Sequence, residues 1–232
     1  MKEDELEIAG LRVVSVGDPE EAKQVVVLLH GFQMQPSDLA PFAHSLGAPA
    51  WFLFPEAPLA ADPSGRAWWH IDAKLRDQTL LKGPRDFAEQ HPPDLARARA
   101  QLLALVTALA PRVGPRPLVL GGFSQGAMLT CDTVLRSTFP LSAMVLLSGS
   151  RIAFDEWEPL LPNGRLRGLP TLVAHGNTDA DLAFAAGTAL RDCLTAAGAD
   201  VTWQPFEQGH EIPLVVWRAL RKFLATLHAA AS

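Results

Sequence analysis

Short apolar runs alternate along the chain with longer stretches that mix apolar and polar residues. The short runs have the length of β-strands that are buried on both faces. Strands are expected at residues 25–29, 51–54, 118–121, 143–147, 171–174 and 201–205, after a strand or hairpin within 6–16. Helices are expected near 37–46, 94–110, 125–137, 182–197 and 214–228, with Asp94 as an N-cap candidate.

This alternation predicts an α/β fold with a mainly parallel central sheet and helices on both faces. A length of 232 residues suits one domain, expected over residues 1–232, with an ample core. The sequence contains no inserted segment long enough for a large cap domain. The longest irregular stretches, 56–93 and 148–169, both leave the carboxyl end of a strand, where open α/β sheets form their sites.

Charge and cysteine content exclude several classes of function. A net charge of −5 provides no basic surface for nucleic acid or anionic lipid. The basic residues Lys74, Arg76, Lys82 and Arg85 form a loose run that is expected to face solvent. The acidic start of the chain and the lack of an apolar stretch of about 18 residues predict neither a signal peptide nor a membrane span. Together with two unpaired cysteines, these features favour a cytoplasmic location.

The segment around Ser124 has the G-x-S-x-G pattern of a nucleophile elbow, running from Gly122 to Gly126. An apolar run precedes it and a predicted helix follows it. A strand that turns sharply into a helix lifts the serine Oγ to the top of the sheet, and the flanking glycines remove side chains that would collide there. The sequence therefore predicts Ser124 as a nucleophile.

An acid and a base are expected downstream of the serine, in that order. Asp179 follows the strand at 171–174, and His210 lies in the loop before the last helix. His210 is expected to take the serine proton, while Asp179 holds the orientation of the imidazole ring. Asp181 is the competing carboxylate, expected to start or cap the next helix, and His175 ends a strand.

Two backbone N–H groups are needed to stabilise the oxyanion of an acyl-transfer intermediate. One is expected from Gln125, the residue after the nucleophile, and the other from Phe32, which follows the His30-Gly31 turn after an early strand.

These motifs together resemble the phospholipase/carboxylesterase family of α/β-hydrolases, which includes bacterial carboxylesterases and acyl-protein thioesterases. The resemblance rests on L-H-G at 29–31, G-F-S-Q-G at 122–126, H-G-x-x-D at 175–179 and G-H-E-I-P at 209–213. It implies an α/β-hydrolase fold, a Ser124–His210–Asp179 triad and oxyanion amides from Phe32 and Gln125. One departure is His70, which stands where the family usually has Asp.

The predicted function is hydrolysis of carboxylic esters with small to medium acyl chains through an acyl-enzyme, with thioesters left open. Two alternatives remain: an amidase that uses the same triad, and a non-catalytic fold that binds a small apolar ligand. No cofactor and no metal are expected, because no ligand spacing is present. The oligomeric state is not predicted. Candidate pocket residues come from the two irregular stretches and are Trp68, Trp69 and Trp157.

Overall fold

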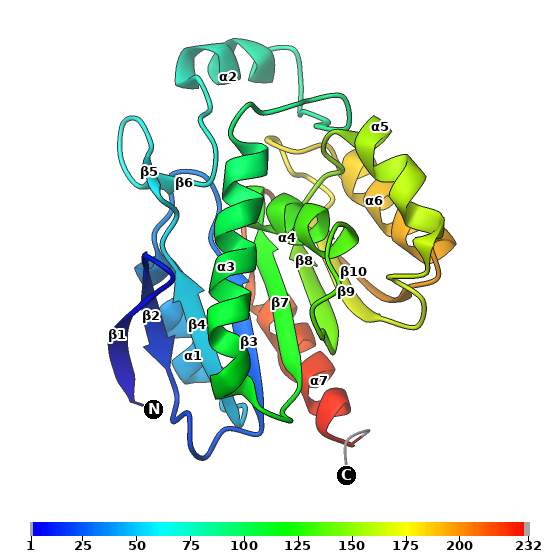
Figure 1. Ribbon diagram of the computed structural model, residues 1–232. Helices are drawn as coiled ribbons and strands as arrows, with labels where there is room; N and C mark the ends of the chain where they lie inside the picture. Colours follow the sequence, from blue (N-terminus) through cyan, green and yellow to red (C-terminus); the bar gives the residue numbers. More distant parts are fainter. Residues whose placement is uncertain (1, 230–232) are drawn as a thin grey trace.

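The computed structural model of the protein describes residues 2–229. It has an eight-stranded sheet in the order β1-β2-β4-β3-β7-β8-β9-β10 (Figure 1). The first two strands are an antiparallel hairpin, β2 is antiparallel to β4, and every later pair is parallel. The strand bounds are β1 Glu3–Ile8, β2 Leu11–Val16, β3 Gln24–Leu29, β4 Ala50–Pro55, β7 Leu118–Phe123, β8 Ala143–Leu147, β9 Pro170–Gly176 and β10 Asp200–Phe206.

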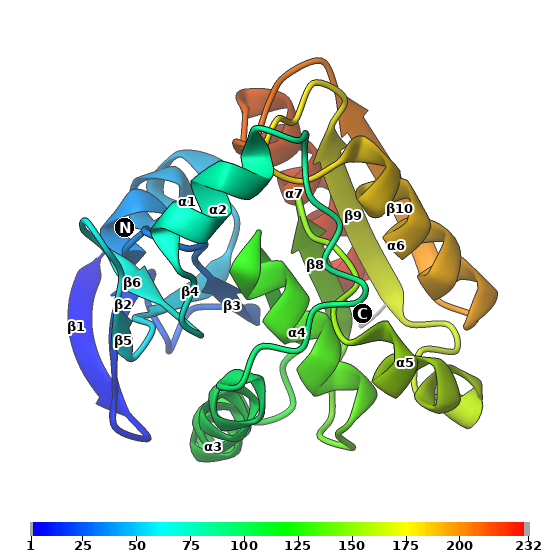
Figure 2. The same ribbon diagram turned by 90° about the horizontal axis from the view of Figure 1, so that it is seen from above.

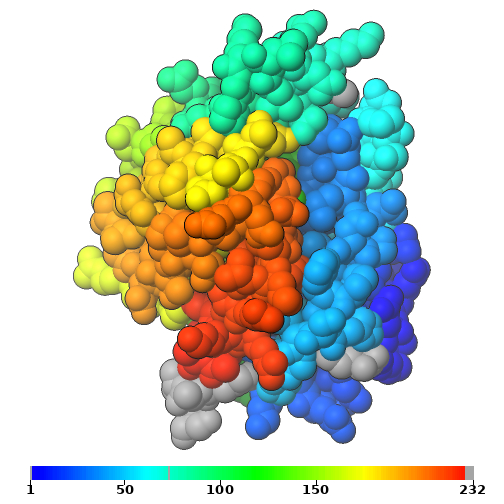
Figure 3. All heavy atoms as spheres, turned by 180° about the vertical axis from the view of Figure 1, so that it is seen from behind, coloured from blue at the N-terminus to red at the C-terminus, as the bar shows by residue number. Residues whose placement is uncertain are grey.

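Helices cover both faces of this sheet, as the sequence predicted. On one face lie α3 (Leu95–Val113), α4 (Gln125–Leu135) and α6 (Phe184–Ala196). On the other lie α1 (Ala40–Leu46) and α7 (Leu214–Ala229), which contact each other and are seen side by side from behind (Figure 3). The prediction of a mainly parallel sheet between two helical layers is confirmed.

Strand β3 shows why the predicted strands are continuous apolar runs. Val25, Val27 and Leu29 join the hydrophobic cluster under α3 and α4, whereas Val26 and Leu28 join the cluster under α1 and α7. All six residues of the strand are buried. Side chains alternate between the faces of a strand, so a strand with a helix layer on each side favours the continuous apolar run Val25–Leu29 that follows Gln24.

Several short elements fall in the stretches expected to be irregular. These are β5 (Leu59–Ala60), β6 (Arg66–Ala67), α2 (Ala73–Leu80), α5 (Phe154–Trp157) and the 3-10 helix Glu158–Asn163. The expected helix at 37–46 is divided into a 3-10 turn, Pro36–Asp38, and α1. Helix α2 lacks an apolar stripe, which explains why no helix was predicted there. Asp72 is its N-cap: the Asp72 side chain accepts a hydrogen bond from the Leu75 amide at 2.9 Å.

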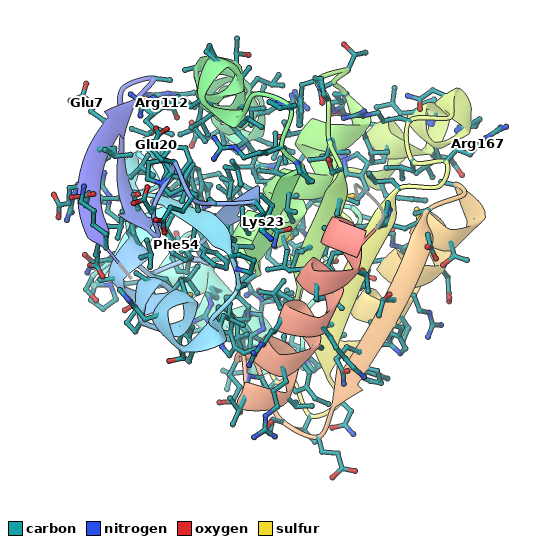
Figure 4. All side chains as sticks on the ribbon, turned by 90° about the horizontal axis from the view of Figure 1, so that it is seen from below. Glu7, Glu20, Lys23, Phe54, Arg112 and Arg167 are labelled. Carbon is teal, nitrogen blue, oxygen red and sulfur yellow. The ribbon has the colours of Figure 1, made fainter. Side chains whose placement is uncertain are left out.

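The carboxyl ends of the parallel strands share one edge of the sheet, and α2 lies over that end (Figures 1 and 2). The opposite end is formed by the loops that enter the strands, where Figure 4 labels Glu20, Lys23 and Arg167. Within residues 2–229, none of the helices has the length and apolar character needed to cross a membrane.

Candidate active site

Ser124 lies at the turn between β7 and α4, with φ 53° and ψ −115°. A non-glycine residue at positive φ is strained and persists only where its surroundings enforce it. A Cβ on Gly122 would lie 2.5 Å from the Gly126 carbonyl carbon, and one on Gly126 would lie 2.4 Å from the Leu29 oxygen. Both glycines are therefore required for α4 to follow β7 this closely, as the sequence argument expected.

The structure brings together the three residues predicted as a triad. The Nε2 atom of His210 lies 2.8 Å from Ser124 Oγ, and its Nδ1 atom lies 2.7 Å from Asp179 Oδ2. The three residues come from the ends of β7, β9 and β10. Parallel neighbouring strands end at the same edge of the sheet, so residues 86 positions apart in the chain come within hydrogen-bond distance.

Asp179 is fixed in position by backbone donors. Its Oδ1 atom accepts hydrogen bonds from the amides of Asp181 and Leu182 at 2.8 and 2.9 Å. An ionised carboxylate only accepts hydrogen bonds, so the His210 nitrogen facing it carries the proton. In the neutral imidazole, Nε2 of His210 is then the acceptor for the hydroxyl proton of Ser124.

His175 also lies near Asp179, but it cannot serve as the base in this arrangement. Its Nε2 atom donates to the Leu182 carbonyl at 3.1 Å and lies 3.4 Å from Asp179 Oδ2. Burial lowers the pKa of His175, which favours a neutral ring. The residue supports the β9 turn rather than contacting Ser124.

Phe32 and Gln125, the predicted oxyanion donors, both line the cavity that contains Ser124. Gln125 is the first residue of α4, where an amide has no carbonyl of its own helix to bond. Gly31 allows the Phe32 turn to come close, because a Cβ on Gly31 would lie 3.3 Å from Ser124 Cβ.

His30 orients the peptide that carries the Phe32 amide. Its Nε2 atom accepts a hydrogen bond from the Ala57 amide at 3.0 Å, so its Nδ1 atom carries the proton and donates to the Gly31 carbonyl at 2.8 Å. Because the Gly31 carbonyl and the Phe32 amide belong to one planar peptide, holding the first directs the second. Burial lowers the pKa of His30 to about 4.

The side chain of Gln125 has a structural function that sequence reasoning missed. It accepts from the Trp68 amide at 2.8 Å and donates to the Trp69 carbonyl at 2.9 Å. It therefore fastens the loop 68–70 to the start of α4.

The cavity at Ser124 has a volume of about 200 Å³. It adjoins a second cavity of about 430 Å³, which lies under α2 and includes His70 in its lining. The two share four lining residues: Ile71, Arg76, Arg85 and Phe87.

None of the three tryptophans named as pocket candidates lines the Ser124 cavity. Trp68 is buried, and its indole donates to the His30 carbonyl at 3.0 Å. Trp157 is buried and donates to Asp132 at 2.8 Å. Trp69 is buried with its edge on the adjoining cavity. The expectation that these tryptophans line the pocket is therefore wrong for the Ser124 cavity. A long loop that crosses the end of a sheet buries its largest apolar side chains in the core, because burial removes the most apolar surface from water.

Asp181 does not cap α6, since that helix starts after Ala183 and the Asp181 carboxylate is held by Arg76 and Arg85. The expectation that the whole basic run faces solvent is therefore wrong for these two arginines. Their side chains are only 23% and 13% exposed, and both line the Ser124 cavity.

Comparisons with known proteins agree with this arrangement. The family model described as Phospholipase/Carboxylesterase matches residues 9–228. Acyl-protein thioesterase 1 of Kluyveromyces lactis is 28% identical over 191 residues, which are 74% of each chain. Esterase YpfH of Escherichia coli is 25% identical over 212 residues, covering 82% of this chain and 77% of YpfH.

Among solved structures, the esterase PE8 superimposes with a TM-score of 0.78 at 24% sequence identity, covering 98% of this chain and all of PE8. At that level of identity the match establishes the fold, an α/β-hydrolase fold without a large cap. With the family model matched over nearly the whole chain, the protein belongs to the phospholipase/carboxylesterase family of hydrolases.

Proposed function

We propose that this protein is a serine hydrolase that cleaves carboxylic esters of small to medium acyl groups through an acyl-enzyme. The observation that carries the proposal is the 2.8 Å contact between Ser124 Oγ and His210 Nε2, backed by Asp179 at 2.7 Å from the other ring nitrogen. A nucleophile bonded to a base that is itself oriented by a third group is the arrangement that activates serine.

In the first half-reaction, Ser124 Oγ attacks the ester carbonyl carbon while its proton passes to His210 Nε2. The carbonyl oxygen becomes an oxyanion that accepts hydrogen bonds from the amides of Phe32 and Gln125. The tetrahedral intermediate then collapses, and the leaving alcohol takes the proton from His210. Asp179 stabilises the imidazolium that forms between these two transfers.

In the second half-reaction, water attacks the acyl-Ser124 carbonyl with His210 again as the base. The oxyanion forms and collapses at the same amides, and Ser124 recovers its proton as the carboxylic acid leaves. The same steps apply to a thioester, with a thiol as the leaving group.

The size of the cavity supports short acyl groups. Its volume of about 200 Å³ is below the roughly 300–1,000 Å³ of sites that hold drug-sized ligands. The adjoining 430 Å³ provides room for a medium chain beyond Ile71 and Phe87.

The test combines a covalent probe with a substrate series. A fluorophosphonate probe is expected to label Ser124, and the Ser124→Ala variant is expected to escape labelling and to lose about four decades of kcat. Four-nitrophenyl esters from acetate to laurate, matched to thioesters, then measure chain and leaving-group preference. A Ser124→Ala variant that keeps more than a tenth of the activity contradicts the nucleophile, and a wild type with neither labelling nor turnover favours a non-catalytic ligand-binding fold.

A further inference from the structure

The cavity at Ser124 contains a cluster of three charged side chains that the proposed chemistry does not use. Arg76 lies on α2, Arg85 follows α2, and Asp181 lies two residues after Asp179. Each arginine donates through Nη2 to a different carboxylate oxygen of Asp181. We call this the Arg76–Asp181–Arg85 cluster.

The cluster is rigidly connected to the end of β9 through the backbone. The Arg85 amide donates to the Asp181 carbonyl at 2.9 Å, and the Ala183 amide donates to the Arg85 carbonyl at 2.9 Å. Arg85 and Leu182 pair as in a parallel sheet. Arg85 is therefore held at a fixed place relative to the turn that carries Asp179, as a specificity residue requires.

The cluster has an excess of positive charge. Two guanidinium groups face one carboxylate, and among residues 2–229 the only other ionisable side chain that lines this cavity is His210. A guanidinium is a permanently charged group, and Asp181 stays ionised: its burial opposes ionisation, but hydrogen bonds from Arg85 and Arg76 and the charge of Arg85 lower its pKa overall. One arginine would be enough to neutralise Asp181. The Nη1 atom of Arg76 also lies 3.5 Å from Asp77, but the Asp77 side chain is 74% exposed and does not line the cavity, so water screens its charge. The second guanidinium therefore leaves a positive charge beside the reacting serine.

Two further carboxylates near the cluster, Asp72 and Asp86, are engaged elsewhere. Asp72 accepts from the Leu75 amide, and Asp86 accepts from the Ala88 amide and from Ser150 while Arg151 lies 3.5 Å away. Neither carboxylate is bonded to Arg76 or Arg85 in the described part of the chain.

Arg85 bonds Asp181 through Nη2. A guanidinium has five N–H groups suited to paired bonds with a carboxylate, so this bond leaves its other terminal nitrogen, Nη1, for a ligand. The Nε atom has no hydrogen-bond partner within residues 2–229, but it is closed off from the cavity by burial and is not a donor that a ligand reaches. The guanidinium stacks on Phe87, 4.8 Å from the ring centroid, which fixes the plane of its donors.

Apart from Gln33 and Gln125, apolar side chains line the rest of the cavity. They are Phe32, Met34, Ile71, Phe87, Phe123, Met128 and Leu182. The cavity therefore offers three kinds of surface to one substrate. Its ester carbonyl would lie at Ser124, a short methylene chain would contact the apolar side chains, and an anionic end would reach the cluster.

We propose that the Arg76–Asp181–Arg85 cluster recognises a carboxylate on the substrate, so that preferred substrates are esters carrying a free carboxylate a few carbons from the scissile bond. This rests on the proposed function and specifies its substrate class.

The first experiment compares two esters with the same five-carbon acyl chain, 4-nitrophenyl pentanoate and the mono-4-nitrophenyl ester of glutarate. The wild type is expected to favour the glutarate ester at least tenfold in kcat/KM. Arg85→Gln keeps hydrogen-bonding capacity without the charge, and it should reduce this preference, the ratio of the two kcat/KM values, to below threefold. Lys74→Gln, an exposed change of equal charge on α2, should keep the preference.

A second pair of esters places the carboxylate on the alcohol side: the butanoyl ester of 3-hydroxypropanoate against propyl butanoate, followed by acid release. A preference in the first pair assigns the carboxylate to the acid part of the substrate, and a preference in the second assigns it to the alcohol part. The proposal is overturned if the wild type hydrolyses both esters of each pair at equal rates. It is also overturned if Arg85→Gln lowers kcat/KM for the glutarate and pentanoate esters by the same factor. Arg76→Gln repeats the test where Arg85→Gln fails to fold.

A binding measurement separates this proposal from the proposed function. Free glutarate should slow fluorophosphonate labelling of the wild type at millimolar concentration and raise its Tm, whereas pentanamide should do neither. Arg85→Gln should abolish both effects. If the probe labels Ser124 and glutarate has no effect, the proposed hydrolase function stands and the carboxylate site is refuted. If no ester is hydrolysed but glutarate still raises the Tm, the carboxylate site stands and the proposed hydrolase function is refuted.

Discussion

Asp179 and Asp181 are two residues apart and have different surroundings. Asp179 bonds His210, whereas Asp181 bonds two arginines. Asp179→Asn is expected to lower kcat by roughly 10⁴, because an amide at this position favours the wrong imidazole tautomer. Asp181→Asn should instead act mainly on KM. Both constants are measured on 4-nitrophenyl butanoate, and a larger kcat loss in Asp181→Asn would show that the wrong carboxylate was assigned.

The Gln125 side chain supplies a second prediction for a single residue. Gln125→Ala leaves the Trp68 amide and the Trp69 carbonyl without partners in the interior. Since an unsatisfied buried group costs about 1–3 kcal/mol, the free energy of unfolding should fall by about 2–4 kcal/mol in urea titrations. Gln78→Ala, on the exposed side of α2, is the matched control and should change it by less than about 0.5 kcal/mol. Equal stability of the two variants would contradict the conclusion that the Gln125 side chain holds the loop 68–70.

His30 makes stability depend on pH. Its pKa is about 4 in the folded protein against 6.5 for an unperturbed histidine, so the unfolded chain binds the proton first as pH falls. The stabilisation is therefore complete above pH 6.5 and is lost as pH falls toward 4, by up to about 3 kcal/mol for a difference of this size.

Urea titrations between pH 4 and 7 measure this slope. His30→Asn can keep a donor toward the Gly31 carbonyl without a titrating ring, and it should flatten the slope. His175, whose pKa burial also lowers, should contribute the slope that remains. An unchanged slope in His30→Asn would mean that other groups cause it.

At the scale of elements, α4 is the helix that the fold depends on most. All eleven of its residues are buried, including Asp132. The Asp132 carboxylate accepts hydrogen bonds from Arg99 on α3, from Arg136 and from Trp157. It therefore connects α3, α4 and α5 beneath the elbow that carries Ser124.

Asp132→Asn should destabilise the protein by about 2–3 kcal/mol, less than for a fully buried pair because both guanidiniums reach solvent. Asp192→Asn, an exposed change on α6 next to Arg191, is the control and should have little effect. Urea titration of both variants makes the comparison. A kcat on 4-nitrophenyl butanoate that stays normal in folded Asp132→Asn would show that the contact supports the fold and not the chemistry.

For the whole molecule, the proposed chemistry needs only side chains and backbone amides. Within residues 2–229, no group of three or more His, Cys, Asp or Glu side chains is arranged to hold a metal ion. Activity on 4-nitrophenyl butanoate is therefore expected to survive prolonged dialysis against a chelator. Loss of activity that a divalent metal restores would refute the metal-free mechanism.

The sequence alone predicted the α/β fold, with a sheet between two helical layers, and the residues that meet at Ser124. Both follow from local signals: apolar runs such as Val25–Leu29 indicate burial on both faces, and the glycines at 122 and 126 stand where any side chain would collide with neighbouring backbone. Because neighbouring parallel strands end at one edge, chain order was enough to select Asp179 and His210.

Only the tertiary structure decided which side chains surround Ser124, His210 and Asp179. Arg85 and Asp181 are 96 residues apart, and no periodicity indicates that they form a pair. The tryptophans of the same loops turned out to be core residues, because a loop folded over a sheet buries its apolar side chains and directs others toward the cavity. The direction of a loop side chain depends on the packing of the whole loop, and for this reason the cavity walls, unlike the elbow, could not be read from the sequence.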